Sequence, residues 1–192
     1  MKKLVKKNKH GFYEVSSKPQ QTELEVYYAE KYYQKPNGQY QKVYSKGELE
    51  YFANKATICL HTIKKFLPEV TSFFEVGCGE GFFANELYKA GVQKIILNDF
   101  SEAGIESFNP HLKHFFKKLD IYELIEEFAN QNVHFSLISM DNVLEHVVDP
   151  EDLLEKLKLI MRGNSVLRIT IPNDFSAFQY MLINEGLTEE TW

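Results

Sequence analysis

From residue 71 to residue 171, short runs of apolar residues alternate with stretches in which apolar residues recur every three or four positions. The first pattern predicts buried strands and the second predicts amphipathic helices. The predicted strands are 71–76, 94–98, 114–119, 133–140 and 165–171, and the predicted helices are 82–90, a short one after Ser101, 122–130 and 150–163. Strands that alternate with helices predict an α/β fold, with a doubly wound, mostly parallel sheet between two helical layers (α/β/α).

The chain before residue 71 has a different pattern. Residues 1–21 are rich in Lys and show no period that would bury one face, so we expect a flexible arm. Residues 22–68 are predicted to form an N-terminal helical cap, in which apolar spacing favours a helix over 45–67 that stops at Pro68. The third segment, 69–192, contains all five predicted strands.

Composition restricts the class of protein. Of the 192 residues 44% are hydrophobic and 26% are charged, which is typical of a globular protein. No apolar run reaches the roughly 18 residues that a membrane helix needs, so no membrane partner is expected. Cys59 and Cys78 do not form a closely spaced pair, and no apolar run follows the basic start of the chain. These features predict a reduced, cytoplasmic protein.

A glycine-rich turn carries the most specific signal. Gly77, Gly79 and Gly81 follow the first predicted strand and precede a predicted helix, at the sheet edge where open α/β sheets bind ligands. A dinucleotide site would have Gly or Ala at the position of Phe82, and a phosphate-binding P-loop would have a Lys after the glycines. Both are missing, and the acids Glu75 and Glu80 flank the turn. A ligand with positive charge and no phosphate suits this turn best.

The E-x-G-x-G-x-G run from Glu75 to Gly81 resembles the first motif of class I S-adenosylmethionine-dependent methyltransferases. The resemblance extends over about residues 24–180 and implies a Rossmann-like fold. It also implies S-adenosylmethionine as cofactor and S-adenosylhomocysteine as product. This cofactor has a sulfonium and an ammonium group and no phosphate, so the charge of the turn and the resemblance agree.

The resemblance also implies a set of cofactor-binding residues. Asp99 with Phe100, at the end of the second strand, would hold the ribose hydroxyls, and Asp120 with Ile121 would lie at the adenine edge. The implied set is Glu75, Gly77, Cys78, Gly79, Gly81, Phe82, Asp99, Phe100, Asp120, Ile121, Asp141, Asn142 and Val143. Alternatives stay open here. The glycines also fit a plain strand–helix turn, and Asp99 also fits a turn acid that leads into a helix. Asp120 also fits the N-cap of the helix that follows it, and Cys78 also fits a small buried residue.

The run from Ser139 to Val147, followed by Asp149-Pro150, is similar to the V-L-E-H-V-x-D-P run of small-molecule methyltransferases. Its Glu145 and His146 are candidate catalytic residues, because a His that titrates near neutrality can act as a base toward a hydroxyl nucleophile. The alternative is that both residues only complete a helical turn. No His, Cys or Asp cluster has metal-ligand spacing, and no metal is predicted.

Seven of the eleven Tyr residues lie in the predicted cap, and Tyr28, Tyr32 and Tyr33 are candidates for closing the site over the substrate. Packing of a helix onto the sheet is the alternative. Charge supports a lid, because residues 1–65 carry a net charge of +7 (13 Lys, 6 Glu) and the rest of the chain carries −12. We therefore interpret the front third as a basic lid over an acidic cleft and do not expect a nucleic-acid partner.

The acceptor is predicted to be an oxygen, a carbon or a simple amine of a small molecule. The Asn/Asp-Pro-Pro-Tyr/Phe run of enzymes that methylate bases or glutamine amides is replaced by Met140-Asp141-Asn142-Val143. Only 21 residues follow the fifth strand, so we expect the last two strands of the family's seven-stranded sheet to be missing and the fifth strand to form an exposed edge, where a homodimer can form. A cofactor-binding but inactive or regulatory subunit, and a methyltransferase acting on a macromolecule, are the alternative functions.

Overall fold

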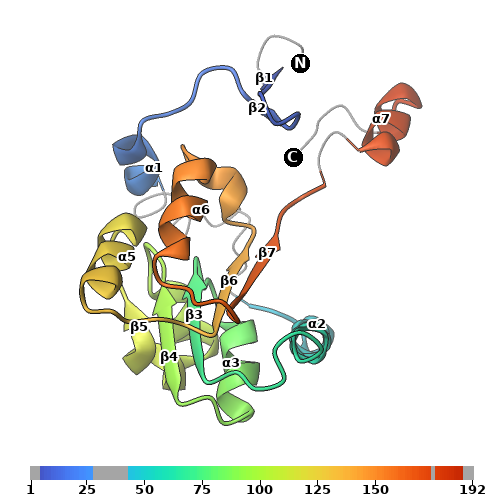
Figure 1. Ribbon diagram of the computed structural model, residues 1–192. Coiled ribbons are helices and arrows are strands. Elements are labelled where there is room, and N and C mark those ends of the chain that lie inside the picture. Colours follow the sequence, from blue (N-terminus) through green and yellow to red (C-terminus); the bar gives the residue numbers. More distant parts are fainter. Residues whose placement is uncertain (1–4, 28–42, 174–175, 188–192) are drawn as a thin grey trace.

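The computed structural model describes residues 5–27, 43–173 and 176–187 (Figure 1). Its centre is a five-stranded sheet with the order β5-β4-β3-β6-β7, and every neighbouring pair is parallel. The strands are β3 (Ser72–Val76), β4 (Lys94–Asn98), β5 (Phe116–Lys117), β6 (Leu137–Asp141) and β7 (Val166–Thr170). The predicted doubly wound α/β fold is confirmed.

Helices cover both faces of this sheet (Figure 1). One face packs against α2 (Lys46–Ile63), α3 (Phe82–Lys89), α4 (Ala103–Phe108) and the 3-10 helix η2 (Pro110–Phe115), and the other packs against α5 (Ile121–Asn130) and α6 (Pro150–Lys158). Each face has its own hydrophobic cluster. Successive residues of a strand point to opposite faces, so Phe73 belongs to the first cluster and Phe74 to the second.

Two predicted strands differ from the structure. The strand predicted over 114–119 is reduced to β5, because Pro110 begins a 3-10 helix that runs to Phe115. The strand predicted over 133–140 starts only at Leu137. Before it, Asn132 turns with a positive φ of 53°, and the Phe135 N–H bonds to the Ile160 carbonyl, outside the sheet.

Side chains cap the first turns of α6 and α2. Asp149 accepts a hydrogen bond from the backbone N–H of Asp152 at the start of α6. Ser45 and Glu48 form a reciprocal capping box at the start of α2. Ser101, however, is not the N-cap of α4. Glu102 holds that position and makes no side-chain cap, while Ser101 Oγ accepts from the Ala103 N–H at 3.3 Å.

The order in which the chain adds strands to the sheet reverses at β3. The chain goes from β3 through α3 to β4 on one side, and β6 pairs with β3 on the other. A crevice therefore opens at the carboxyl ends of β3 and β6, where this class of sheet binds ligands.

The start of β3 is joined to the start of β6 by a pair of serines. Ser136 Oγ accepts from the N–H groups of Thr71 and Ser72 at 3.1 and 3.0 Å, and donates to the Ser72 carbonyl at 2.8 Å. Ser72 Oγ in turn accepts from the Ser136 N–H at 2.9 Å. These bonds fix the two strands against each other before their backbone ladder begins.

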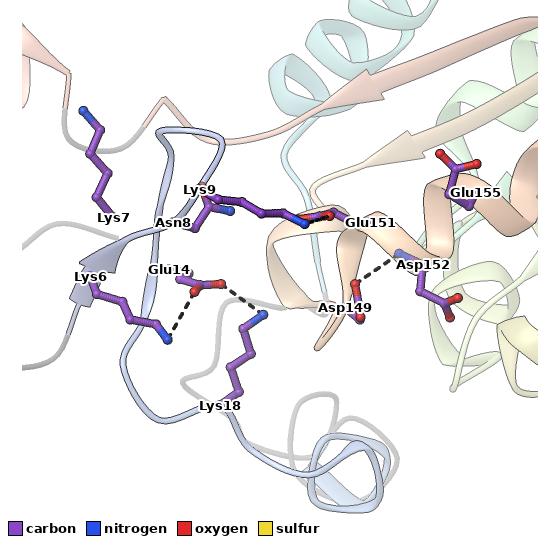
Figure 2. A pocket seen from close by; sticks show the side chains of 10 residues that line it. All are labelled: Lys6, Lys7, Asn8, Lys9, Glu14, Lys18, Asp149, Glu151, Asp152 and Glu155. Carbon is purple, nitrogen blue, oxygen red and sulfur yellow. Dashed lines mark hydrogen bonds and ion pairs between the residues drawn. The ribbon is translucent and has the colours of Figure 1, made fainter.

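The Lys-rich residues at the front of the chain contain a hairpin that the sequence did not predict. Strand β1 (Val5–Lys7) pairs antiparallel with β2 (Tyr13–Val15), and α1 (Gln21–Tyr27) follows. Lys9 and His10 both lie against Glu151 of α6, at 2.9 and 3.0 Å. Lys9 and Glu151 line a crevice of about 580 Å³ (Figure 2). Part of the basic charge is therefore balanced by α6. Such exposed ion pairs are weakened by salt.

The chain leaves the sheet through β7, the edge strand, and ends its described part in α7 (Ala177–Asn184). No residue of α7 is buried. In the described part of the chain, no helix combines the length and the apolar character needed to span a bilayer.

We expect Ser136→Ala to lower the free energy of unfolding by about 1–3 kcal/mol, because two backbone N–H groups lose their side-chain acceptor near the sheet. Chemical denaturation with equal m-values measures this change. Ser107→Ala is the control, since Ser107 is exposed and its hydroxyl bonds, among the described residues, to the Ala103 carbonyl of its own helix turn. Equal stability of the two variants would contradict the role of the serine pair.

Candidate functional site

A cleft of about 340 Å³ lies at the carboxyl ends of the central strands. Most of the residues predicted for the site line it. These are Glu75, Gly77, Cys78, Gly79, Gly81, Phe82, Asp99, Phe100, Asp141, Asn142, Val143 and His146. Strands β3, β4, β6 and β7 supply its floor and the turns after them, and α2 supplies one wall through Lys55, Ala56 and Cys59.

The glycine turn is built by two different requirements. Gly77 has a φ of 64°, and a Cβ there would collide with the side chain of Val143, so Gly77 is needed for packing between β3 and the turn after β6. Gly79 has a φ of 51° and nothing within 4 Å of its Cβ position. Because Gly79 lines the cleft, its missing side chain leaves room for a ligand to approach the backbone.

Gly104 in α4 is a site residue that sequence reasoning missed. A Cβ at this position would collide with the carbonyl of Gly79, so helix α4 packs directly on the backbone of the glycine turn. The signal in the sequence is a lone Gly within a short helix, which is too common to single out.

Asp99 follows β4 and holds the glycine turn in place. Its Oδ2 accepts from the Gly79 N–H at 3.0 Å, and its Oδ1 accepts from the Ser101 N–H at 3.2 Å. Burial raises the pKa of this carboxyl, and the backbone hydrogen bonds oppose that rise. Asp99 thus lies 20 residues after Gly79 in sequence and in direct contact with it in space.

Glu75 is a carboxyl group in the interior. It is 3% exposed, and its Oε2 is buried with no hydrogen-bond partner among the described residues. Burial is the main reason why the pKa of Glu75 is raised to about 8, while the charge of Arg168 lowers it. A buried acceptor without a partner is costly, and a cationic donor in the cleft would satisfy it.

Arg168 is the second residue that the sequence did not reveal. It comes from β7 and donates to Asp141 Oδ2 at 2.8 Å and to Ser139 Oγ at 2.9 Å. Its guanidinium also lies over the ring of Phe83, 5.0 Å from the centroid. Asp141 Oδ1 remains buried without a partner in the described chain. The missed signal is a charged residue inside the apolar run of a predicted strand.

Aromatic rings close the side of the cleft next to α3. Phe52 of α2 stacks on Phe82 at 4.8 Å and 12°, and both line the cleft. The hydroxyl of Tyr44 donates to Glu80 at 2.9 Å, and its ring contacts Phe52 and Phe82. The segment before the sheet is thereby attached to the glycine turn.

Of the two candidate catalytic residues, one lines the cleft and the other does not. His146 lines the cleft from the 3-10 helix η3 (Leu144–His146), and its side chain is half exposed. Glu145 does not line the cleft, although its Oε1 lies 3.8 Å from His146 Nε2. His146 is therefore in reach of a molecule in the cleft, and Glu145 lies next to it outside the lining; the catalytic roles of both residues stay predictions.

Asp120 and Ile121 lie outside the cleft lining. Asp120 is the N-cap of α5, where its Oδ1 accepts from the N–H groups of Tyr122 and Glu123 at 2.8 and 3.3 Å. Ile121 belongs to the hydrophobic cluster under α5 and α6. Asp120 Oδ2 is buried without a hydrogen-bond partner in the described part of the chain. The cap is thus present, and a role of Asp120 and Ile121 at the adenine edge stays a prediction.

The remaining predicted residues are Tyr28, Tyr32 and Tyr33, which lie outside the described residues. Over the ranges 5–27, 43–173 and 176–187, no three His, Cys, Asp or Glu side chains are grouped to hold a metal ion.

Comparison with known proteins gives the family. The model of a family described as "Methyltransferase domain" matches residues 50–189. The chain therefore belongs to this methyltransferase family, whose methyl donor is S-adenosylmethionine. A search of curated protein sequences gives no match.

Solved structures show the same fold. The plantazolicin methyltransferase BpumL, in complex with a pentazolic desmethylPZN analogue and S-adenosylhomocysteine, has a TM-score of 0.53 and 21% identity over 86% of this chain. The sugar N-methyltransferase KedS8 from Streptoalloteichus sp ATCC 53650 has a TM-score of 0.51 and 15% identity over 69% of this chain. The chain spans 63% of the BpumL chain and 58% of the KedS8 chain.

We expect Asp120→Ala to destabilise the fold by about 1 kcal/mol through loss of the α5 N-cap, and to leave the affinity for S-adenosylhomocysteine unchanged. Thermal unfolding and calorimetric titration of the same sample measure the two effects. Asp120→Asn, which keeps a capping oxygen, is the control. A loss of affinity in both variants would instead assign Asp120 to the cofactor.

Proposed function

We propose that this chain is an S-adenosylmethionine-dependent methyltransferase that transfers a methyl group to an oxygen, a carbon or a simple amine of a small molecule. The observation that supports it most is the buried Glu75 oxygen beside the glycine turn, which has no hydrogen-bond partner among the residues that the structure describes. The buried, acidic floor of the cleft fits a donor that carries positive charge and no phosphate.

The residues present fit the parts of this donor. Glu75 would accept from the ammonium group, and Asp99 would accept from the ribose hydroxyls as a bidentate partner. The open space at Gly79 admits the donor close to the backbone. Phe82 and Phe100 offer aromatic surface in the same cleft.

The bound donor supplies a methyl group on a sulfonium that is already activated for in-line displacement. The protein then has to orient the acceptor and exclude water, and positioning alone supplies about 7–11 kcal/mol of a typical barrier. His146 lies in the cleft lining, where it would take a proton from an acceptor hydroxyl, and Glu145 would orient the ring.

Two alternatives remain distinct from this proposal. One is a cofactor-binding subunit without catalysis, and the other is a methyltransferase acting on a macromolecule. The first is excluded by methyl transfer to any acceptor by the isolated chain. The second is tested by offering the chain a panel of small phenols, acids and amines beside protein and RNA acceptors. It is supported if only a protein or an RNA is methylated.

We expect the wild-type chain to bind S-adenosylhomocysteine and Asp99→Ala to bind it at least about tenfold more weakly, which corresponds to about 1.4 kcal/mol. Isothermal titration calorimetry measures both affinities. Asp152→Ala is the matched control, since Asp152 is an exposed acid on α6 away from the cleft. The proposal fails if the wild type does not bind, or if Asp99→Ala binds equally well.

A further inference from the structure

A row of polar residues crosses three neighbouring strands on one face of the sheet. Glu75 of β3 is in register with Ser139 of β6, and Ser139 is in register with Arg168 of β7. Two residues earlier in the same strands, the apolar residues Phe73, Leu137 and Val166 belong to or pack on the cluster under α2 and α3. The polar row therefore lies above a hydrophobic layer and below the cleft.

Arg168 joins this row to Asp141, two residues further along β6. Its guanidinium is held on the sheet side by Asp141 and Ser139, and on the helix side by the Phe83 ring and by Cys59 Sγ at 3.8 Å. The side chain is 13% exposed. A guanidinium with this many partners has a fixed position, and it fixes one oxygen of Asp141 with it.

Two carboxyl oxygens next to Arg168 are not bound by it, and they indicate a ligand. One oxygen of Glu75 and one oxygen of Asp141 are buried without a hydrogen-bond partner in the described part of the chain, and both residues line the cleft. Two acceptors of this kind, on adjacent strand ends, match a group that donates several hydrogen bonds and carries positive charge.

We propose that Arg168 is a positioning residue that prepares the Glu75–Asp141 carboxyl pair to receive the ammonium group at the amino-acid end of S-adenosylmethionine. This inference rests on the proposed function. Arg168 also lines the cleft, but its guanidinium is bound to Asp141 and Ser139. It acts by holding Asp141 in place and by balancing the negative charge of the pair, so that the pair can be ionised inside the fold.

Several charged or titratable groups face Glu75 from the elements around it. From the sheet these are Asp141, Arg168 and, after β4, Asp99; from the glycine turn they are Cys78 and Glu80; from α2 they are Lys55 and Cys59. The N–H of Ala84 in α3 also bonds to Glu75. Among the charges, Arg168 favours the ionised form of Glu75 most, and Asp141 opposes it.

These charges predict that the affinity for the ammonium group rises with pH. The pKa of Glu75 is about 8, so at pH 7 the carboxyl is mostly protonated and must lose its proton to pair with an ammonium group. Affinity that depends on the ammonium group should therefore rise with pH, by about tenfold per unit well below pH 8, and level off near pH 8. Loss of Arg168 should move this levelling to higher pH, and loss of the Asp141 charge should move it to lower pH.

The experiment compares two ligands over pH 6–9. S-Adenosylhomocysteine has the ammonium group, and 5′-methylthioadenosine has the same adenine, ribose and sulfur without the amino-acid end. The ratio is the dissociation constant of 5′-methylthioadenosine divided by that of S-adenosylhomocysteine. It reports the contribution of the amino-acid end, ammonium and carboxylate together, and removes effects at the ribose, including those of Asp99. The ligand carboxylate does not titrate between pH 6 and 9, so it does not give the ratio a pH dependence in this range. The variants are Arg168→Met, Asp141→Asn and their combination, with Arg162→Met as control, since Arg162 is exposed and lies outside the cleft lining.

We expect the ratio to level near pH 8 for the wild type and for Arg162→Met, above pH 8 for Arg168→Met and below pH 8 for Asp141→Asn. At pH 7 the ratio for Arg168→Met should be several-fold below that of the wild type. The double variant removes one charge of each sign, so its levelling should return toward pH 8. Because it leaves neither an unpaired guanidinium nor an unpaired Asp141 carboxylate, it keeps the test open if Arg168→Met does not fold.

If the ratio of dissociation constants levels at the same pH in all variants that bind both ligands, the role of Arg168 is overturned and the proposed function is left intact. Absence of binding of either ligand to the wild type would instead overturn the proposed function. A purely structural role for Arg168 would weaken both ligands equally and would not shift the pH at which their ratio levels.

Discussion

The parallel pairing of β3 with β6 is the constraint on which the cleft depends. It brings the ends of two strands that are separated by more than sixty residues to one edge of the sheet, and the chain departs from that edge in opposite directions. Glu75 and Asp141 meet there for this reason alone. The Ser72–Ser136 bonds hold the other ends of the same strands and help to fix the register, which places Asp141 two residues beyond Ser139, the partner of Glu75.

A carboxyl group in the interior has to be compensated, because removing it from water costs several kcal/mol if it is ionised. The charge of Arg168, from the edge strand β7, offsets part of this cost because it favours the ionised form of Glu75. Arg168 is close enough to lower the pKa of Glu75 and to bind Asp141 directly, yet it leaves one oxygen of each acid unbound. The site thereby combines a fixed floor with unsatisfied acceptors.

The sequence predicted the parts of the site that directly follow a predicted strand. The glycine turn, Asp99 and the run from Asp141 to His146 follow predicted strands, and strand ends in a parallel sheet share one edge. Arg168 and Gly104 could not be found in this way. Arg168 acts through a partner on the neighbouring strand, and Gly104 is required by contact with a backbone carbonyl from another element. Both depend on packing, which single-sequence periodicity does not contain. For the fold, periodicity predicted the sheet and its layers. It predicted neither the short β5 nor the hairpin at residues 5–15, whose strands of 3 residues are too short to show a period.

The two cysteines differ in exposure, so the wall of the cleft can be labelled at one thiol in the native chain. Cys78 is buried in the glycine turn, and burial, with the nearby charge of Asp99, keeps the pKa of its thiol well above the ordinary value. Alkylating reagents react with thiolates, so Cys78 is protected from them. Cys59 is partly exposed and lines the opposite wall on α2. A single label at Cys59 can therefore be attached without any substitution, and the rate of its attachment reports how much of the cleft a ligand covers.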